Sequence, residues 1–386
     1  MRVSHVALDD FRSYRHAVVE FAPGTTVLLG SNGQGKTNLV EAVSYLSAFS
    51  SHRVSAEQAL VRLPLSPDEP QPGGAVVRVR LVTAGERETV IELEIVRGKA
   101  NRAKVNRTQV RPREVLGLLK SVVFSPEDLQ IVRGDPQVRR QFLDDLLIQQ
   151  HPLIAQVKND FDKVARQRAA LMKSAQSQLR RGFTPDFSTV EVWDDTFAQL
   201  SAQLSLARVG LVDELRGPAA HAYEEIGGSP RKLDIEFLAS QGNCPVGGDL
   251  ATLVGELKEI LASARMKEVE RGVNLFGAHR DDLKLTLGGM PVKGYASHGE
   301  TWSVALSLRL GAFELLSRDG DTPILILDDV FAELDSSRRA GLTRMITGAE
   351  QVLITAAVAD DVPQELHAQV HAVHWDPELG TVVGDE

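Results

Sequence analysis

The sequence of 386 residues contains one cysteine, Cys244. A single cysteine cannot form a disulfide within the chain or build a metal centre of several thiolates. The first residues carry no apolar run like that of a secretory signal peptide, and no apolar stretch approaches the roughly 20 residues that span a bilayer. We therefore expect a cytoplasmic protein with no membrane segment.

Aromatic residues are also scarce, at 5% of the chain, which disfavours a surface that stacks bases. The formal net charge is −9 and the pI about 5.7, an acidic total that argues mildly against a nucleic-acid ligand. Local clusters of charge can override that total. Hydrophobic residues make up 43%, which is enough for a sizeable core.

Apolar periodicity predicts an α/β protein interrupted by a helical segment. Alternating or apolar runs predict strands at 3–8, 26–29, 75–83, 89–97, 283–287, 324–327 and 352–354, and helices at 36–49 and 299–317. Long helical patterns fill 136–272, with a turn expected at 181–185. We expect a discontinuous head, 1–135 and 273–386, and an inserted, mainly helical second lobe, 136–272.

The strongest motif follows the apolar run 26–29. It reads Gly30-Ser31-Asn32-Gly33-Gln34-Gly35-Lys36-Thr37 and fits the P-loop spacing, with an expected helix behind it. Glycines allow backbone N–H groups to wrap a phosphate, and the helix N-terminus favours an anion. Lys36 would reach the β- and γ-phosphates of ATP, and the Thr37 hydroxyl would ligate Mg²⁺.

A second acidic motif follows the apolar strand 324–327. Asp328 would hold Mg²⁺, directly or through water, and Asp329 would position or activate the attacking water. Two adjacent carboxylates after a buried strand repel each other, and a bound cation removes that cost. Lys36, Asp328 and Asp329 are therefore the expected catalytic residues.

The turn Ser297-His298-Gly299-Glu300 precedes a helix, which is followed by the Asp pair. This layout resembles the ABC ATPases, in which a serine, a glycine and a helix start from one subunit cap the γ-phosphate held by the other. Ser297, Gly299 and Glu300 are therefore expected to contact nucleotide. A simple N-capping turn is the alternative for this short motif.

Four strings in order resemble the RecF family of ABC/SMC-type ATPases over essentially the whole chain. They are Phe11-Arg12-Ser13-Tyr14, the run 123–144 with Arg139 and Arg140, Gly277-Ala278-His279-Arg280-Asp281-Asp282, and Asp328-Asp329-Val330-Phe331 with Glu333-Leu334-Asp335. The resemblance implies a P-loop ATPase head of mixed sheet and helices with an inserted lobe.

The resemblance also implies a function. RecF-like proteins bind ATP, form an ATP-dependent homodimer with two shared sites, and hydrolyse ATP slowly with DNA stimulation. They bind duplex DNA at single-strand gaps and, with the mediators RecR and RecO, help to load the RecA recombinase. By resemblance, Arg12 is a candidate neighbour of the nucleotide.

The most basic stretch, 97–120, contains one acid, Glu114, and no aromatic residue. Such a stretch favours phosphate contacts without sequence preference. The expected DNA-binding residues are Arg102, Lys104, Arg107, Arg111 and Arg113. A solvated hairpin face is the alternative.

Two other functions fit part of this pattern. A transporter's ABC subunit would share the nucleotide motifs but has no reason to carry a long helical insertion between Lys36 and Ser297. A small-molecule kinase would share the P-loop but not the Ser297 turn with the Asp pair. A nucleotide sensor and a structural cap fit Ser125-Pro126-Glu127-Asp128 equally well.

Overall fold

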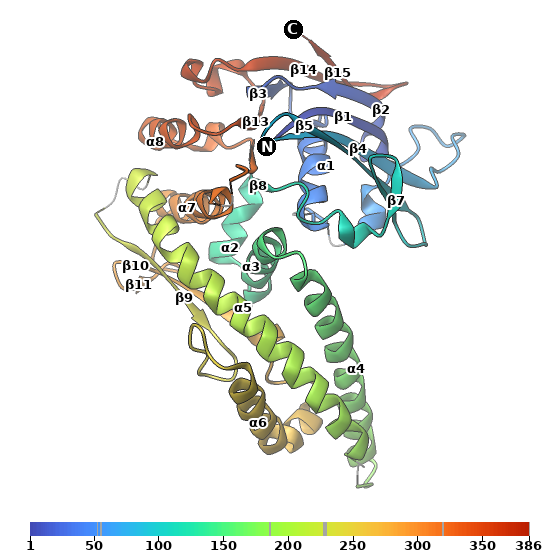
Figure 1. The fold of residues 1–386 in the computed structure, drawn as a ribbon, viewed down its shortest axis with the longest axis vertical. Helices are drawn as coiled ribbons and strands as arrows, with labels where there is room; N and C mark the ends of the chain where they lie inside the picture. Colours follow the sequence, from blue (N-terminus) through green and yellow to red (C-terminus); the bar gives the residue numbers. More distant parts are fainter. Residues whose placement is uncertain (52, 55, 185–186, 227–229, 319, 386) are drawn as a thin grey trace. The chain divides into compact units, whose positions relative to one another are not determined.

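The computed structural model describes residues 1–51, 53–54, 56–184, 187–226, 230–318 and 320–385 (Figure 1). It divides into two compact units. Unit 1 comprises Met1–Leu129, Pro218–Lys232 and Ala296–Glu386, and unit 2 comprises Gln130–Gly217 and Leu233–Tyr295. Segment 218–232, expected in the helical lobe, lies in unit 1, and segment 273–295, expected in the head, lies in unit 2.

Among the described residues, 12 strands of unit 1 join in one sheet, in the order β7-β6-β5-β4-β1-β2-β15-β14-β3-β13-β12-β8. Their bounds are β1 Arg2–Phe11, β2 Tyr14–Glu20, β3 Gly24–Leu29, β4 Gly74–Thr83, β5 Arg87–Val96, β6 Arg102–Val105, β7 Thr108–Val110, β8 Ser121–Phe124, β12 Ile324–Asp328, β13 Gln351–Ala356, β14 Gln369–Asp376 and β15 Gly380–Asp385. Strands β14, β3, β13, β12 and β8 pair in parallel and the other pairs are antiparallel.

Strands β12 and β13 are short and mostly apolar, as expected for parallel strands covered on both faces. Every residue of β12 and of β13 is buried. Helices α1 (Lys36–Ala48), α7 (His298–Ser317) and α8 (Ser336–Ile346) belong to this unit, with short 3₁₀ turns η1 Glu57–Leu60, η2 Pro112–Glu114, η3 Pro126–Asp128, η5 Phe331–Glu333, η6 Ala359–Asp361 and η7 Gln364–Leu366. The β3-to-α1 connection lies at the end of the central parallel strands, where α/β proteins bind ligands.

Unit 2 is mainly helical, as the sequence predicts. Its helices are α2 (Leu129–Arg133, which begins at the last residue of unit 1), α3 (Pro136–Gln150), α4 (Ile154–Arg180), most of α5 (Ser188–Ile226) and α6 (Leu250–Arg271), with η4 (Ala278–Arg280). Helices α4, α5 and α6 share a core that includes Phe161, Phe197 and Leu257. Of the turn expected at 181–185, Pro185 lies outside the described residues.

A small sheet in unit 2 contains the strand predicted at 283–287 and a partner strand, 233–238, that the sequence does not predict. Strand β10 (Asp282–Leu287) lies between β9 (Leu233–Leu238) and β11 (Met290–Pro291). Strands β9 and β10 pair antiparallel from Leu233↔Leu287 to Leu238↔Asp282. Across the described part of the chain, no helix is both long enough and apolar enough to cross a membrane.

An arginine at the centre of unit 2 anchors three segments. The Arg168 side chain is fully buried and donates to Asp194 (2.6 Å), Glu268 (2.6 Å) and the Asn274 side chain (2.8 Å). Its guanidinium carbon also lies 5.1 Å from the Phe197 ring centre. Because a buried ion must be fully paired, these bonds fix α4, α5 and the C-terminal region of α6 to one another.

Candidate functional site

The P-loop, residues 30–37, connects β3 to α1 and has the backbone geometry that phosphate binding needs. Gly33 and Gly35 have φ angles of 83° and 101°, in the left-handed region that favours glycine. A side chain at Gly30 would collide with the Val373 carbonyl of β14, and one at Gly35 would collide with Thr381 and Ser13. The loop is therefore glycine-rich for two reasons: backbone conformation and close packing against neighbouring strands.

Lys36 points its ammonium group into this loop. The side chain is 3% exposed, and Nζ donates to the Gly30 carbonyl (2.7 Å) and the Ser31 carbonyl (3.3 Å). Asn32 Oδ1 lies at 3.5 Å. A positive charge enclosed by backbone groups at a helix N-terminus is suited to an anion.

Thr37 and Asp328, which are distant in sequence, meet beside the loop. Thr37 Oγ1 donates to Asp328 Oδ1 at 3.0 Å. Parallel pairing of β12 with β13 places Thr355 opposite Asp328, and Thr355 Oγ1 donates to the same Oδ1 at 2.6 Å. The structure thus joins two of the predicted site residues and adds Thr355, which is not among the predicted ones.

Asp329 has a strained backbone. Its φ is 52°, an uncommon value for a residue that is not glycine, and such strain clusters at functional sites. The Asp329 N–H donates to Thr355 Oγ1 at 2.9 Å. Thr355 therefore accepts from the Asp329 N–H and donates to the Asp328 carboxylate, which fixes that carboxylate and the Asp329 backbone relative to β13.

The predicted corner Phe11-Arg12-Ser13-Tyr14 supports the P-loop from outside. The Tyr14 hydroxyl donates to the Gly35 carbonyl (3.1 Å), and Ser13 Oγ accepts from Asn38 and Thr381 (2.7 Å each). Arg12 makes two hydrogen bonds to the Glu41 carboxylate, at 2.6 and 2.8 Å.

Glu41 on α1 is fully buried. Burial alone would raise the pKa of Glu41, but hydrogen bonds from Arg12 and Ser51 outweigh it and hold that pKa below its ordinary value. A charged Glu41 in turn fixes Arg12. In this structure Arg12 thus anchors α1, while its expected proximity to nucleotide remains a prediction.

The signature turn, residues 297–300, caps helix α7. Ser297 Oγ accepts from the Glu300 N–H (3.3 Å), and the Glu300 carboxylate accepts from the Ser297 N–H (2.9 Å), a reciprocal capping box. Arg231 forms an ion pair with Glu300. The Ser297 backbone N–H, with help from Arg231, lowers the pKa of Glu300 and keeps it charged.

The predicted N-capping role of this turn is therefore present, and Ser297 itself is exposed. Gly299 lies against Arg338, whose guanidinium would be 2.8 Å from an added Cβ. The hydrogen bonds of Ser297 and Glu300 run within the turn and to Arg231.

The turn at Ser125 has the geometry of a cap. Its N–H donates to the Asp128 carboxylate (3.0 Å), and Asp128 also accepts from Arg309 of α7 (2.6 Å). These contacts support the structural cap rather than the nucleotide sensor as the role of this turn.

The five predicted DNA-binding residues are all exposed, but they differ in their partners. They are Arg102 and Lys104 on β6, Arg107 in the turn to β7, and Arg111 and Arg113 at η2. Arg102 pairs with Glu94 (3.6 Å) and Lys104 with Glu92 (2.6 Å), each across the β5–β6 ladder. The sequence analysis missed these partners because they lie just outside the basic stretch.

Other basic candidates have structural roles in unit 2. Arg139 pairs with Asp282 (2.6 Å), and Arg140 donates to the Asp281 carbonyl (2.7 Å). His279 and Arg280 also lie in unit 2.

The site residues fit a nucleoside triphosphate with Mg²⁺. Thr37 and Asp328 offer converging hard oxygen ligands, the type that Mg²⁺ prefers. The described residues contain no group of three or more His, Cys, Asp or Glu side chains arranged for a metal.

Comparisons with known proteins agree with this geometry. A family profile described as "RecF/RecN/SMC N terminal domain" matches residues 2–374. The DNA replication and repair protein RecF of Frankia alni is 49% identical over 370 residues, covering 95% of this chain and 96% of the relative. That of Beutenbergia cavernae is 49% identical over 390 residues, with coverage of 95% and 96%.

Solved structures give the same result. The recombination mediator protein RecF-ATPrS of the RecFOR pathway matches with a TM-score of 0.86 and 27% identity, covering 100% of this chain and 98% of that one. An Smc head bound to the C-winged helix domain of ScpA matches with a TM-score of 0.56 and 15% identity over 100% and 98% of the chains, which shows the fold alone. The predicted fold class is confirmed, and the chain belongs to the RecF family within the RecF/RecN/SMC group.

Proposed function

We propose that this protein is an ATP-switched DNA-binding protein of recombinational repair. The observation that carries the proposal is the convergence of the P-loop, Thr37 and the Asp328–Thr355 pair at the end of the parallel strands. The named relatives, DNA replication and repair proteins RecF, support the repair context.

In this proposal the P-loop N–H groups of residues 30–35 and the Lys36 ammonium bind the phosphates. Thr37 and Asp328 would hold Mg²⁺, which supplies charge stabilisation at the β- and γ-phosphates when bound. Asp329 orients water for attack on the γ-phosphate. The strained backbone of Asp329 and its bond to Thr355 fix the carboxylate before substrate arrives.

A second copy of the chain completes each site. The exposed Ser297, with Gly299 and the N-terminus of α7 behind it, contributes hydrogen-bond donors and a positive dipole end. ATP thus joins two heads, the dimer binds duplex DNA beside a single-strand gap, and slow hydrolysis stimulated by DNA releases it. RecR and RecO are the proposed protein partners, and RecA loading the proposed outcome.

Light scattering with and without ATP tests the shared site. Lys36→Ala removes the phosphate contact and should abolish both ATP binding and ATP-dependent dimers. Ser297→Arg should retain ATP binding but block dimers, because the added side chain occupies the space of the partner's γ-phosphate.

Ser297→Ala is the control for the cap, since it removes the Oγ acceptor without adding bulk. It should still dimerise with ATP, although more weakly than the unaltered protein because one hydrogen-bond donor to the γ-phosphate is lost, and at most about 2 kcal/mol should be lost from helix α7. Normal ATP-dependent dimers of Ser297→Arg would refute the shared site. An ATPase unaffected by duplex DNA would instead favour an ABC-type subunit with another macromolecular partner.

A further inference from the structure

Helix α4 contains a strongly basic segment in an acidic protein. From Lys163 to Arg180 the helix has no Asp or Glu but five basic residues, whereas the whole chain has a net charge of −9. Arg168 is buried in the core described above, and Lys163 pairs with Asp160 at 3.5 Å. The other three basic residues are Arg166, Lys173 and Arg180.

These three residues form what we call the basic stripe. They are seven positions apart, so they lie on one side of the helix at intervals of about 10 Å, with a drift of about 20° per step. All three are exposed. Among the residues that the structure describes, none of the three forms an ion pair, in contrast to the pairing of Arg102 and Lys104 with glutamates.

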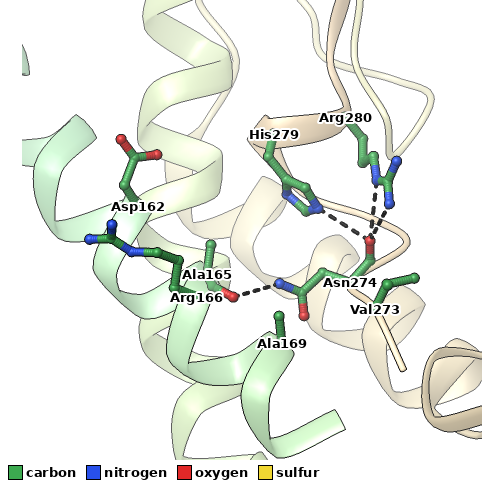
Figure 2. Close-up of a pocket in the computed structure, with 8 residues that line it drawn as sticks. All are labelled: Asp162, Ala165, Arg166, Ala169, Val273, Asn274, His279 and Arg280. Carbon is green, nitrogen blue, oxygen red and sulfur yellow. Dashed lines mark hydrogen bonds between the residues drawn. The ribbon is translucent and has the colours of Figure 1, made fainter. Parts of the chain in front are cut away.

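The stripe ends at a pocket of about 400 Å³ in unit 2. Figure 2 shows Arg166 projecting from α4 and Arg280 from η4 on either side of Asn274. Two of the lining residues, Ala165 and Ala169, have small, uncharged side chains. The acid in the lining, Asp162, is paired with Lys158 at 2.9 Å, and the lining also contains the cationic residues Arg166 and Arg280.

Within the described part of the chain, no carboxylate holds Arg280 in place. Its Nε and Nη2 donate to the Asn274 carbonyl at 3.2 and 3.0 Å, and the Asn274 side chain donates to the Ala165 carbonyl at 2.8 Å (Figure 2). Arg168 also donates a hydrogen bond to the side-chain oxygen of Asn274. A guanidinium that is oriented in advance, with its charge uncompensated, is well prepared to bind an oxyanion.

His279, beside Arg280, adds no charge. Burial lowers the pKa of His279 to about 4, so the ring is neutral at pH 7. It contacts the Phe161 and Phe197 rings, at 6.1 and 6.0 Å between centres. Its role is to pack the η4 turn that carries Arg280.

We propose that the basic stripe and Arg280 form a second nucleic-acid surface, which binds the phosphodiester backbone of duplex DNA. The proposal rests on the DNA binding proposed above and places part of it in unit 2. A row of exposed cations without acidic partners gives affinity without sequence preference.

The test measures duplex affinity by fluorescence anisotropy over a range of KCl concentrations. The triple variant Arg166→Gln, Lys173→Gln, Arg180→Gln should bind more weakly, and the slope of log K against log[salt] should flatten by about 2 to 3, near 0.9 per lost phosphate contact. Unchanged ATP binding shows that unit 1 of the variant is folded, and an unchanged helical circular dichroism signal shows that unit 2 is folded.

A control variant removes three exposed cations that do have acidic partners: Lys258→Gln, Lys284→Gln and Arg318→Gln, whose partners are Asp195, Glu236 and Glu314. Each variant loses three positive charges, which changes the formal net charge from −9 to −12. A general effect of charge would therefore act on both variants equally. The control should keep the slope of the unaltered protein.

An unchanged slope in the stripe variant, with normal DNA binding by the unaltered protein, would overturn the stripe proposal and leave the proposed function standing. No DNA binding by the unaltered protein would overturn both. Stripe-dependent binding of polyglutamate without binding of duplex would overturn it in favour of an acidic protein segment.

Discussion

One hydroxyl group organises the acidic half of the nucleotide site. Thr355 is 1% exposed and is bonded to both aspartates, as an acceptor from the Asp329 N–H and a donor to Asp328 Oδ1. Two neighbouring carboxylates repel each other, so their orientation depends on donors supplied by the protein. Thr355 is therefore a positioning residue that acts through Asp328 and Asp329.

Thr355→Val keeps the shape of the side chain and removes the hydroxyl. Because partners of metal ligands commonly contribute 10- to 100-fold, we expect the Mg²⁺ concentration for half-maximal ATP hydrolysis to rise by about that factor. A Mg²⁺ titration of the ATPase rate measures this. Thr355→Ser restores the hydroxyl and should restore the titration, whereas a purely structural role would leave the Mg²⁺ midpoint of Thr355→Val unchanged.

The sequence predicts the residues whose role follows from spacing along the chain. Gly30, Lys36 and Thr37 are adjacent in a motif, and Asp328 follows an apolar strand. Thr355 acquires its role only from parallel pairing of β12 with β13, which a single sequence does not reveal. The bond from Arg12 to Glu41 is hidden in the same way, because it joins a strand corner to a helix.

Helix packing depends on glycine at one contact between α7 and α5. A Cβ added to Gly311 of α7 would lie 2.8 Å from the Ala219 nitrogen and 2.9 Å from its Cα. Backbone atoms cannot move aside as a flexible side chain can. The two helices can therefore approach this closely only because residue 311 has no side chain.

Gly311→Ala should separate these helices and destabilise unit 1 by about 1–3 kcal/mol, as overpacked cores do. Gly255→Ala on α6 is the matched control, since nothing lies within 4 Å of its added Cβ. That change should stabilise its helix by up to about 1 kcal/mol. Urea unfolding measures both, and equal effects of the same sign would contradict the close-contact argument.

Elements with regular periodicity were predictable, and elements that depend on distant partners were not. The β4–β5 hairpin and the helices from α3 to α6 follow apolar patterns in the sequence. Strand β9 was missed because its partner β10 lies across helix α6 in the chain. The acidic partners of Arg102 and Lys104 belong to the preceding strand, so the charge balance of β6 also required the structure.

For the whole assembly, a shared site predicts complementation between two inactive proteins. In a mixed dimer of Lys36→Ala and Ser297→Arg chains, one site carries both changes and the other carries neither. Mixing the two proteins should therefore restore ATP hydrolysis, although each alone is inactive. The ATPase rate across mixing ratios measures this, with a maximum expected at equal amounts.

Lys36→Ala mixed with Asp328→Ala is the control, because those two changes affect the same half of the site. Each site in a mixed dimer then carries one defect, and no activity should return. Equal recovery in both mixtures, or recovery in neither, would contradict a site divided between Lys36 and Ser297.

The segment Pro218–Lys232 leaves unit 2 at the end of α5 and belongs to unit 1. It supplies Ala219, which contacts Gly311, and Arg231, which pairs with Glu300 of the signature turn. Excising residues 130–295 to obtain a minimal ATPase would therefore delete the counterion of its own signature turn. Pro218–Lys232 lies in the chain between the two segments of unit 2, Gln130–Gly217 and Leu233–Tyr295, although it belongs to unit 1. A shortened protein that keeps the signature turn intact therefore has to carry Pro218–Lys232 as a grafted peptide.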